Sequence, residues 1–347
     1  MSIELPSSTL RLRIDCAAIA DNWRAMQDLS GRAEAGAAVK ADAYGIGVTR
    51  AMPALRQAGC KVFFVAHWSE VPAVLPYLGG GMLSVLHGPL SDADCRFARE
   101  SGARPVLNSL EQVRLWRESG GGPCDLMVDT GMNRLGLRPE ELADPAIGGL
   151  QVDTLMSHLA CADEDSAMNR RQRDAFAAVL GMIPHRAASL ANSAGIALGK
   201  DFHFGVTRPG LALYGGVPRP EMASVIRQVV VPEAAVLQVR RVRTGETVGY
   251  GATFVAPRDM RVGIVSIGYA DGYLRAWSDR GTFRHGDAAL PVIGRVSMDM
   301  TALDLSAVDD LREGDWVAAQ YDLPAAAERT GLTQYELLTL SGPRLRY

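Results

Sequence analysis

Eight short apolar runs between residues 35 and 210 each end in a polar side chain that could take part in chemistry. These residues are Lys40, His67, His87, Asn108, Asp129, His158, Asn192 and Arg208. An amine, an imidazole, an amide and a guanidinium come from Lys40, His158, Asn192 and Arg208. Such a set suits an organic cofactor that reacts with an amine, and because no metal-ligand cluster accompanies it we expect no metal. At His67, His87 and Asn108 we expect ordinary structural roles.

Short strands alternating with helices must position these residues. The runs include "KVFFVAH", "GMLSVLH" and "CDLMVD", and the segments between them carry helix signals, such as Ser109 as an N-cap. Strands that are apolar throughout predict a parallel sheet covered on both faces, and eight of them are the number that closes into a (β/α)₈ barrel. The carboxyl ends of barrel strands share one rim, where these polar residues would meet.

A doubly wound open sheet is the competing fold. It would place its ligand after a G-x-G-x-x-G turn, and no such turn follows the first run here. Polar residues at the end of nearly every run favour the barrel.

Past residue 216 the pattern changes to alternation with period two. "AAVLQVRRVRTGETVGYGATFVAP" and "MRVGIVSIGYADGY" predict a second, mostly β domain. The opening "TLRLRID" also alternates and precedes a helix expected over residues 16–30 with Asp15 as its cap, so this strand could join the second domain's sheets. We therefore expect a barrel over residues 11–220 and a mostly β domain from residues 1–10 plus 221–347.

The composition is that of an ordinary soluble globular protein. The 347 residues are 48% hydrophobic and 22% charged with a net charge of -3, so no basic excess indicates nucleic acid or a membrane surface. No uncharged run is long enough to cross a bilayer and the first residues do not resemble a leader, so we expect a cytoplasmic protein. The five cysteines are scattered without a C-x-x-C pair, which predicts reduced thiols.

Ordered sequence blocks extend along nearly the whole chain. They are "AAVKADAYGIG", "DTGMNRLG", "SHLACADE", "ANSAGI", "TRPGLALYGG", "VGYGATF", "IGYADGY" and "GRVSMDM". Their order resembles the alanine racemases that depend on pyridoxal 5'-phosphate, and so many blocks across both expected domains leave little room for coincidence. The resemblance implies a fold-type III enzyme that acts as a head-to-tail homodimer. It also implies interconversion of L- and D-alanine by two bases on a pyridoxal-phosphate aldimine, supplying D-alanine for peptidoglycan.

By this resemblance Lys40 forms the Schiff base with the cofactor and acts on one face of the substrate Cα. Racemisation removes a proton from one face and returns one to the other, so a second base is needed. The family assigns it to a tyrosine, here Tyr250 in "VGYGATF", which reaches the lysine from the neighbouring subunit. With reference pKa values of about 10, the lysine amine and the tyrosine hydroxyl are both protonated at neutral pH. Partial desolvation must therefore lower the pKa of Lys40, and a neighbouring group must help Tyr250 to act as a base.

The resemblance also implies the cofactor-binding residues. His158 resembles the histidine that contacts the tyrosine and links it to Arg208, which in turn resembles the arginine facing the pyridine nitrogen. Because arginine can only donate, that nitrogen stays unprotonated, which disfavours transamination. Barrels hold phosphate on backbone N–H groups after their last two strands. The other residues expected at the cofactor are Tyr44, Asn192, Ser193, Gly210 and Leu211.

For the substrate carboxylate, the resemblance assigns the Arg134 side chain and the backbone N–H of Met298. Asp299 is expected to orient the wall that the partner subunit contributes, and Tyr269 to narrow the substrate channel.

The chain departs from the family pattern at three places. Met127 lies where many relatives carry a lysine, often carbamylated, whose negative charge positions the arginine, so Arg134 must be oriented otherwise, by Asn133 or by a bound anion. Ile46 replaces a usual histidine, and Gly342 lies where some relatives place a tyrosine on the phosphate.

Three alternatives remain. The first is a racemase for serine or for a wider range of amino acids, because a small pocket separates a methyl from a hydroxymethyl group poorly. The second is a carrier-like cofactor-binding barrel, which would lack the second domain. The third is an amino-acid decarboxylase, which would carry an E-P-G-R-like phosphate segment that is absent here.

Overall fold

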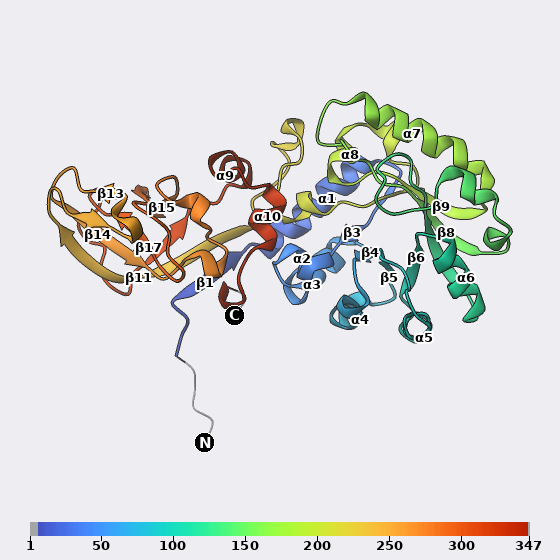
Figure 1. Cartoon of the computed structure of the whole chain (residues 1–347), viewed down its shortest axis with the longest axis horizontal. Coiled ribbons are helices and arrows are strands. Elements are labelled where there is room, and N and C mark those ends of the chain that lie inside the picture. The colour runs from blue at the N-terminus through green and yellow to red at the C-terminus, as the bar shows by residue number, and fades with distance from the viewer. Residues whose placement is uncertain (1–5, 346–347) are drawn as a thin grey trace, which may run out of the picture. The chain divides into compact units, whose positions relative to one another are not determined.

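The computed structural model describes residues 6–345 and divides them into two compact units. One unit contains the described residues up to Asp15 together with those from Gln228 on, and the other is Cys16–Arg227. Residues 1–5 and 346–347, which the predicted domain ranges include, lie outside the described residues. Figure 1 shows both units.

The unit Cys16–Arg227 contains a closed ring of parallel strands. Its strands are β2 (Glu34–Ala35), β3 (Ala37–Ala38), β4 (Val62–Val65), β5 (Met82–Val85), β6 (Arg104–Leu107), β7 (Pro123–Met127), β8 (Gln151–Met156), β9 (His185–Ser189) and β10 (Val206–Thr207). Strands β3 to β9 form one parallel sheet, and β2, which leads into β3, pairs with β10. Hydrogen bonds from Gly205 N to Ala188 O (2.9 Å) and from Arg208 N to Ala191 O (2.8 Å) join β10 to the chain leaving β9. The ring therefore closes, which confirms the predicted barrel.

Helices precede or connect the strands of this ring (Figure 1). They are α1 (Cys16–Ser30), α2 (Lys40–Tyr44), α3 (Val48–Ala58), α4 (Val71–Leu78), α5 (Asp92–Ser101), α6 (Leu110–Glu118), α7 (Ala167–Val179) and α8 (Ser193–Ala197). Ser109 caps α6 as predicted, since its side chain accepts from Gln112 N at 3.2 Å. The helix expected over residues 16–30 is α1.

The barrel interior is apolar in its middle. An inner cluster of buried side chains contains Val62, Phe64, Val106, Met127, Met156 and Val206. All four residues of β4 are buried, as expected for a strand covered on both faces. A larger buried cluster, which includes Leu107, Trp116, Leu155 and Phe176, packs the strands against the outer helices.

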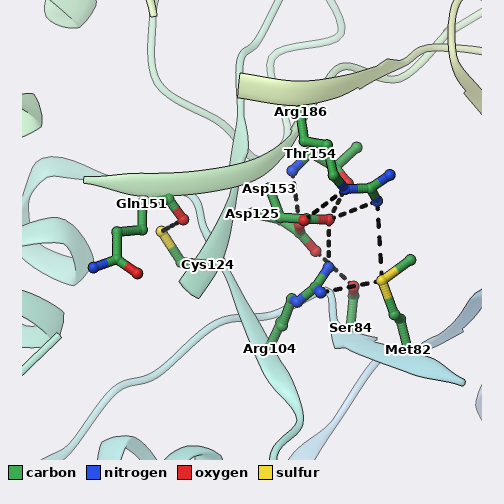
Figure 2. Close-up of polar contacts among 9 residues, drawn as sticks. All are labelled: Met82, Ser84, Arg104, Cys124, Asp125, Gln151, Asp153, Thr154 and Arg186. Carbon is green, nitrogen blue, oxygen red and sulfur yellow. Dashed lines mark hydrogen bonds and ion pairs between the residues drawn. The ribbon is translucent and has the colours of Figure 1, made fainter. Parts of the chain in front are cut away.

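Charged side chains near the start of β6 to β9, together with Ser84 of β5, form a second group, here called the inner charged cluster (Figure 2). Its members are Ser84, Arg104, Asp125, Asp153 and Arg186. Arg104 and Arg186 both bind Asp153, the latter from Nε at 2.8 Å. Asp125 contacts neither arginine directly: Oδ2 accepts from Ser84 Oγ (2.5 Å) and Oδ1 from Thr154 N (3.0 Å). The Thr154 contact fills the register shift between β7 and β8.

We expect Asp125→Asn to stabilise the protein above pH 6. Burial raises the pKa of Asp125 to about 6, so between about pH 4 and 6 the folded chain keeps a proton that the unfolded chain releases. Wild-type stability should therefore fall as pH rises through this window, by up to about 3 kcal/mol. An asparagine can still accept from Thr154 N and donate to Ser84 Oγ without a charge, so the variant should lose this pH dependence. Urea unfolding of both proteins at pH 5 and pH 8 measures the difference.

The control is Asp153→Asn, which should destabilise the protein at both pH values because it removes the carboxylate shared by Arg104 and Arg186. Equal pH profiles for wild type and Asp125→Asn would show that Asp125 does not titrate in this window.

The other unit is mostly β, as predicted. Its elements are β1 (Leu10–Ile14), β11 (Val230–Val242), β12 (Thr247–Val248), β13 (Phe254–Val255), β14 (Met260–Val265), β15 (Thr282–His285), β16 (Ala288–Pro291), β17 (Thr301–Asp304), β18 (Trp316–Ala319), α9 (Leu323–Thr330) and α10 (Gln334–Thr339). The main sheet has the order β16-β15-β18-β11-β14-β17, and β1 pairs antiparallel with β11. The opening strand thus joins the sheet of the second unit.

Within residues 6–345, no helix is both long and apolar enough to span a bilayer. The same residues hold no group of three or more His, Cys, Asp or Glu side chains placed to bind a metal ion. All five cysteines are free thiols.

Candidate active site

The predicted rim residues follow the barrel strands closely. Each lies within three positions of the last residue of its strand, from Lys40 after β3 to Arg208 after β10. His67 and His87 touch edge to face with ring centroids 4.2 Å apart. Asn108 Nδ2 donates to Leu86 O (3.0 Å) and Val106 O (2.9 Å), which is a structural role.

The backbone after Lys40 forms a left-handed turn, and α2 consists largely of it. Ala41, Asp42, Ala43 and Tyr44 all have positive φ, between 52° and 57°. This conformation costs roughly 1–2 kcal/mol per residue for L-amino acids with a side chain. Gly45 N donates to Ala41 O (2.9 Å), and Asp42 Oδ1 accepts from Val48 N (2.8 Å). Such stored strain is typical of functional sites.

The Lys40 amine has a lower pKa than an ordinary lysine amine, which favours its nucleophilic form. Its pKa is lowered, first by desolvation and then by the charges of Arg134 and Arg208, while the carboxylate of Glu70 opposes them. A larger fraction of the amine is therefore unprotonated at neutral pH than in an exposed lysine.

Arg208 and His158 face each other, and only Arg208, which is buried, is charged. Arg208 is 6% exposed; its Nη1 donates to Ser189 Oγ, and its Nη2 donates to Ser157 O (2.5 Å) and faces His158 Nδ1 at 3.5 Å. Burial and then the charge of Arg208 lower the pKa of His158 to about 3, so the imidazole is neutral. Burial lowers the pKa of Arg208 to about 10, which leaves it protonated at neutral pH. Since Nδ1 faces a donor, the imidazole proton is on Nε2.

Three residues expected at the cofactor phosphate lie close together. Ser193 and Gly210 follow the last two strands of the barrel, and Tyr44, which follows β3, lies against Gly210. A Cβ at position 210 would lie 2.2 Å from the Tyr44 hydroxyl oxygen, so only glycine fits there. Ser193 Oγ accepts from Gly210 N (2.9 Å) and Ala212 N (3.2 Å), which leaves its O–H to donate. Among the described residues, none accepts from Leu211 N. The Gly210 N–H is thus already engaged, and the Leu211 N–H and the Ser193 hydroxyl are donors suited to an anion.

Asn192 has a structural contact that the sequence did not indicate. Its Oδ1 accepts from Gly195 N (2.9 Å) and so caps α8. A contact of Asn192 with the cofactor stays a prediction.

Arg134 lies exposed beside Asn133, which has a φ of 56°. No described residue makes a hydrogen bond or ion pair with the Arg134 side chain, so neither Asn133 nor Met127 orients it. Its charge nevertheless lowers the pKa values of Lys40, His87 and His158. The Arg134 charge therefore acts on the same rim, and its exposed guanidinium can bind an anionic group.

In the second unit, the candidate residues Tyr269, Met298 and Asp299 lie on two loops that are joined directly. Tyr269 N donates to Ser297 O and Ala270 N to Met298 O, both at 3.0 Å. The Asp299 carboxylate accepts from Arg344 Nη1 (2.7 Å), a partner that the sequence did not indicate. Tyr250 is 66% exposed and begins a short 3-10 helix, Tyr250–Ala252. Its hydroxyl is thus open to a partner.

A lysine of lowered pKa beside a buried guanidinium, at the rim of a closed barrel, is typical of enzymes that hold an organic cofactor on an amine. Two family models match the chain: "Alanine racemase, N-terminal domain" over residues 14–218 and "Alanine racemase, C-terminal domain" over residues 229–347. The chain therefore belongs to the alanine racemase family, as its motifs predicted.

Individual relatives agree with this assignment. The alanine racemase of Rhizobium meliloti (strain 1021) is 41% identical over 370 residues, covering 99% of this chain and 97% of that protein. A biosynthetic alanine racemase of Agrobacterium fabrum (strain C58 / ATCC 33970) is 41% identical over 364 residues, covering 97% and 92%. An alanine racemase structure from Bartonella henselae, with covalently bound pyridoxal phosphate, has a TM-score of 0.90 at 35% identity and covers 98% of each chain.

Proposed function

We propose that this protein interconverts L- and D-alanine with pyridoxal 5'-phosphate held on Lys40. The observation that carries the proposal is the Lys40 amine, which has a lowered pKa and lies at one rim with the buried Arg208 and its neighbour His158. The relatives' names support the choice of alanine.

The residues present fit this cofactor. The cofactor has three needs: an unprotonated amine for its aldehyde, a hydrogen-bond partner for its ring nitrogen, and hydrogen-bond donors for its phosphate. Lys40 and Arg208 meet the first two needs, and Leu211 N–H with the Ser193 and Tyr44 hydroxyls meets the third. When bound, pyridoxal phosphate supplies the electron withdrawal that makes the substrate Cα proton removable.

Arg208 limits how far that withdrawal goes. Because guanidinium donates and cannot accept, it keeps the ring nitrogen unprotonated. The neutral His158 adds no second charge and presents Nε2–H. This arrangement favours return of the proton to Cα over its delivery to the cofactor, as racemisation requires.

Two groups move the proton at Cα. Lys40 acts on one face and Tyr250 on the other, while Arg134 and the Met298 N–H hold the substrate carboxylate. No described residue accepts from Met298 N, which supports this role. Tyr269 narrows the channel, and Asp299 orients the wall that carries Met298.

We propose that the protein acts as a homodimer in which Tyr250 of one copy serves Lys40 of the other. Tyr250, Met298 and Met300 are all exposed, at 66%, 53% and 43%, which suits residues that a second copy covers. D-alanine made in this way serves peptidoglycan precursors, whose assembly we place in the cytoplasm.

Comparing turnover of alanine and serine tests the substrate choice. We expect kcat/KM for L-alanine to exceed that for L-serine by about tenfold, because a site shaped for a methyl group leaves the added hydroxyl without a hydrogen-bond partner. Chiral chromatography of the products from each L-substrate, and from each D-substrate, measures both rates. Equal values for the two amino acids would support a racemase of wider specificity.

A further inference from the structure

The ladder between β3 and β4 stops one residue before Lys40. Its last backbone hydrogen bond runs from Val39 N to Phe64 O at 2.8 Å. The chain then enters the left-handed turn, whose φ values are incompatible with strand pairing. The backbone that follows Lys40 therefore needs another attachment to the barrel.

The Glu70 carboxylate provides an attachment for the backbone, in addition to the packing of the Tyr44 ring on Tyr214. Glu70 Oε1 accepts from Ala41 N at 2.5 Å, while Oε2 accepts from Ala66 N at 2.7 Å and His67 N at 2.9 Å. Glu70 thus connects the first residue of the turn to the backbone leaving β4. Hydrogen bonds to an ionised acceptor are stronger than those between neutral groups, so this contact helps to hold the strained turn in place.

Glu70 also affects the charge of the site. Its carboxylate raises the pKa of the Lys40 amine, against desolvation and against Arg134 and Arg208. None of the contacts of Glu70 involves a residue that we assign to the substrate. Its influence on the reaction must therefore pass through Lys40.

We propose that Glu70 is a positioning residue for Lys40, whose carboxylate holds the strained left-handed turn against β4 and so fixes the place of the amine. The consequence for catalysis rests on the proposed function. The positioning itself is a property of the cofactor-free chain and can be measured there.

Glu70→Gln tests this role because a glutamine side chain has one accepting oxygen where the carboxylate has two. Whichever way the amide faces, its NH₂ group meets an N–H donor, either that of Ala41 or those of Ala66 and His67. We expect backbone amides of residues 41–45 to exchange about tenfold to hundredfold faster in the cofactor-free variant, measured by hydrogen exchange and mass spectrometry. In the loaded enzyme, kcat should fall about tenfold while KM for alanine changes less than about twofold.

Glu141→Gln is a matched control. Glu141 plays the same capping role in another 3-10 helix, Pro139–Ala143, where its Oε2 accepts from Arg138 N at 2.7 Å. This variant should leave the exchange of residues 41–45 unchanged, and Glu70→Asp should restore part of the protection.

Unchanged exchange of residues 41–45 in Glu70→Gln, or an equal rise in Glu141→Gln, would overturn the proposal. If wild type lacks racemase activity but the exchange rises in Glu70→Gln alone, the positioning role stands and the proposed function fails.

Discussion

Replacing Lys40 with alanine should abolish racemisation, with a fall in kcat of about 10⁴-fold or more. The variant loses both the amine that holds the cofactor and the base on one face of Cα, and a general base alone contributes about 10²–10⁴-fold. Chiral analysis of alanine measures the rate. Borohydride reduction of wild type followed by peptide mapping should mark Lys40.

Peptide mapping can assign the reduced lysine without ambiguity, because Lys61 and Lys200 are the only other lysines in the sequence. Both are exposed, whereas Lys40 is partly buried with a lowered pKa. Lys200→Ala should keep full activity and the mark on Lys40. A mark on Lys61 or Lys200 in wild type, or activity retained by Lys40→Ala, would refute the assignment.

The fold was predictable because its signals are local and agree with one another. Continuous apolar runs such as "KVFFVAH" became fully buried strands, and Ser109 began α6 as a cap. The C-terminal ends of the barrel strands lie on one rim. Predicting the strands was therefore enough to place Lys40, His158 and Arg208 on the same rim. The period-two alternation past residue 216 predicted the second unit, and the motifs then added the role of its tyrosine.

The rest of the site depends on contacts that no local pattern signals. Alanine and tyrosine rarely adopt positive φ, and aspartate does so as a single residue, so nothing in "KADAY" predicts four left-handed residues in succession. The pattern "HWSE" is a helix-cap signal at Glu70, but it does not reveal that the other carboxylate oxygen reaches Ala41. Asp125, in an otherwise apolar run, is satisfied by Ser84 from a strand 41 residues earlier.

Replacing Tyr250 with phenylalanine should slow Cα proton exchange from one alanine enantiomer by about 10³-fold and from the other by less than about tenfold. The hydroxyl is the only group removed, and general acid–base groups contribute about 10²–10⁴-fold to the step they serve. Since Lys40 still acts on the opposite face, one enantiomer keeps its base. Mass spectrometry of L- and D-alanine incubated separately in D₂O measures the two exchange rates.

Tyr335→Phe is the control, since Tyr335 is also exposed (44%) in the same unit but lies on α10. It should leave both exchange rates unchanged. With Tyr250 66% exposed, its substitution should not alter folding, so cofactor content should equal that of wild type. Equal losses for both enantiomers at normal cofactor content would mean that Tyr250 does not serve one face alone, because a two-base site must lose its symmetry when one base is removed.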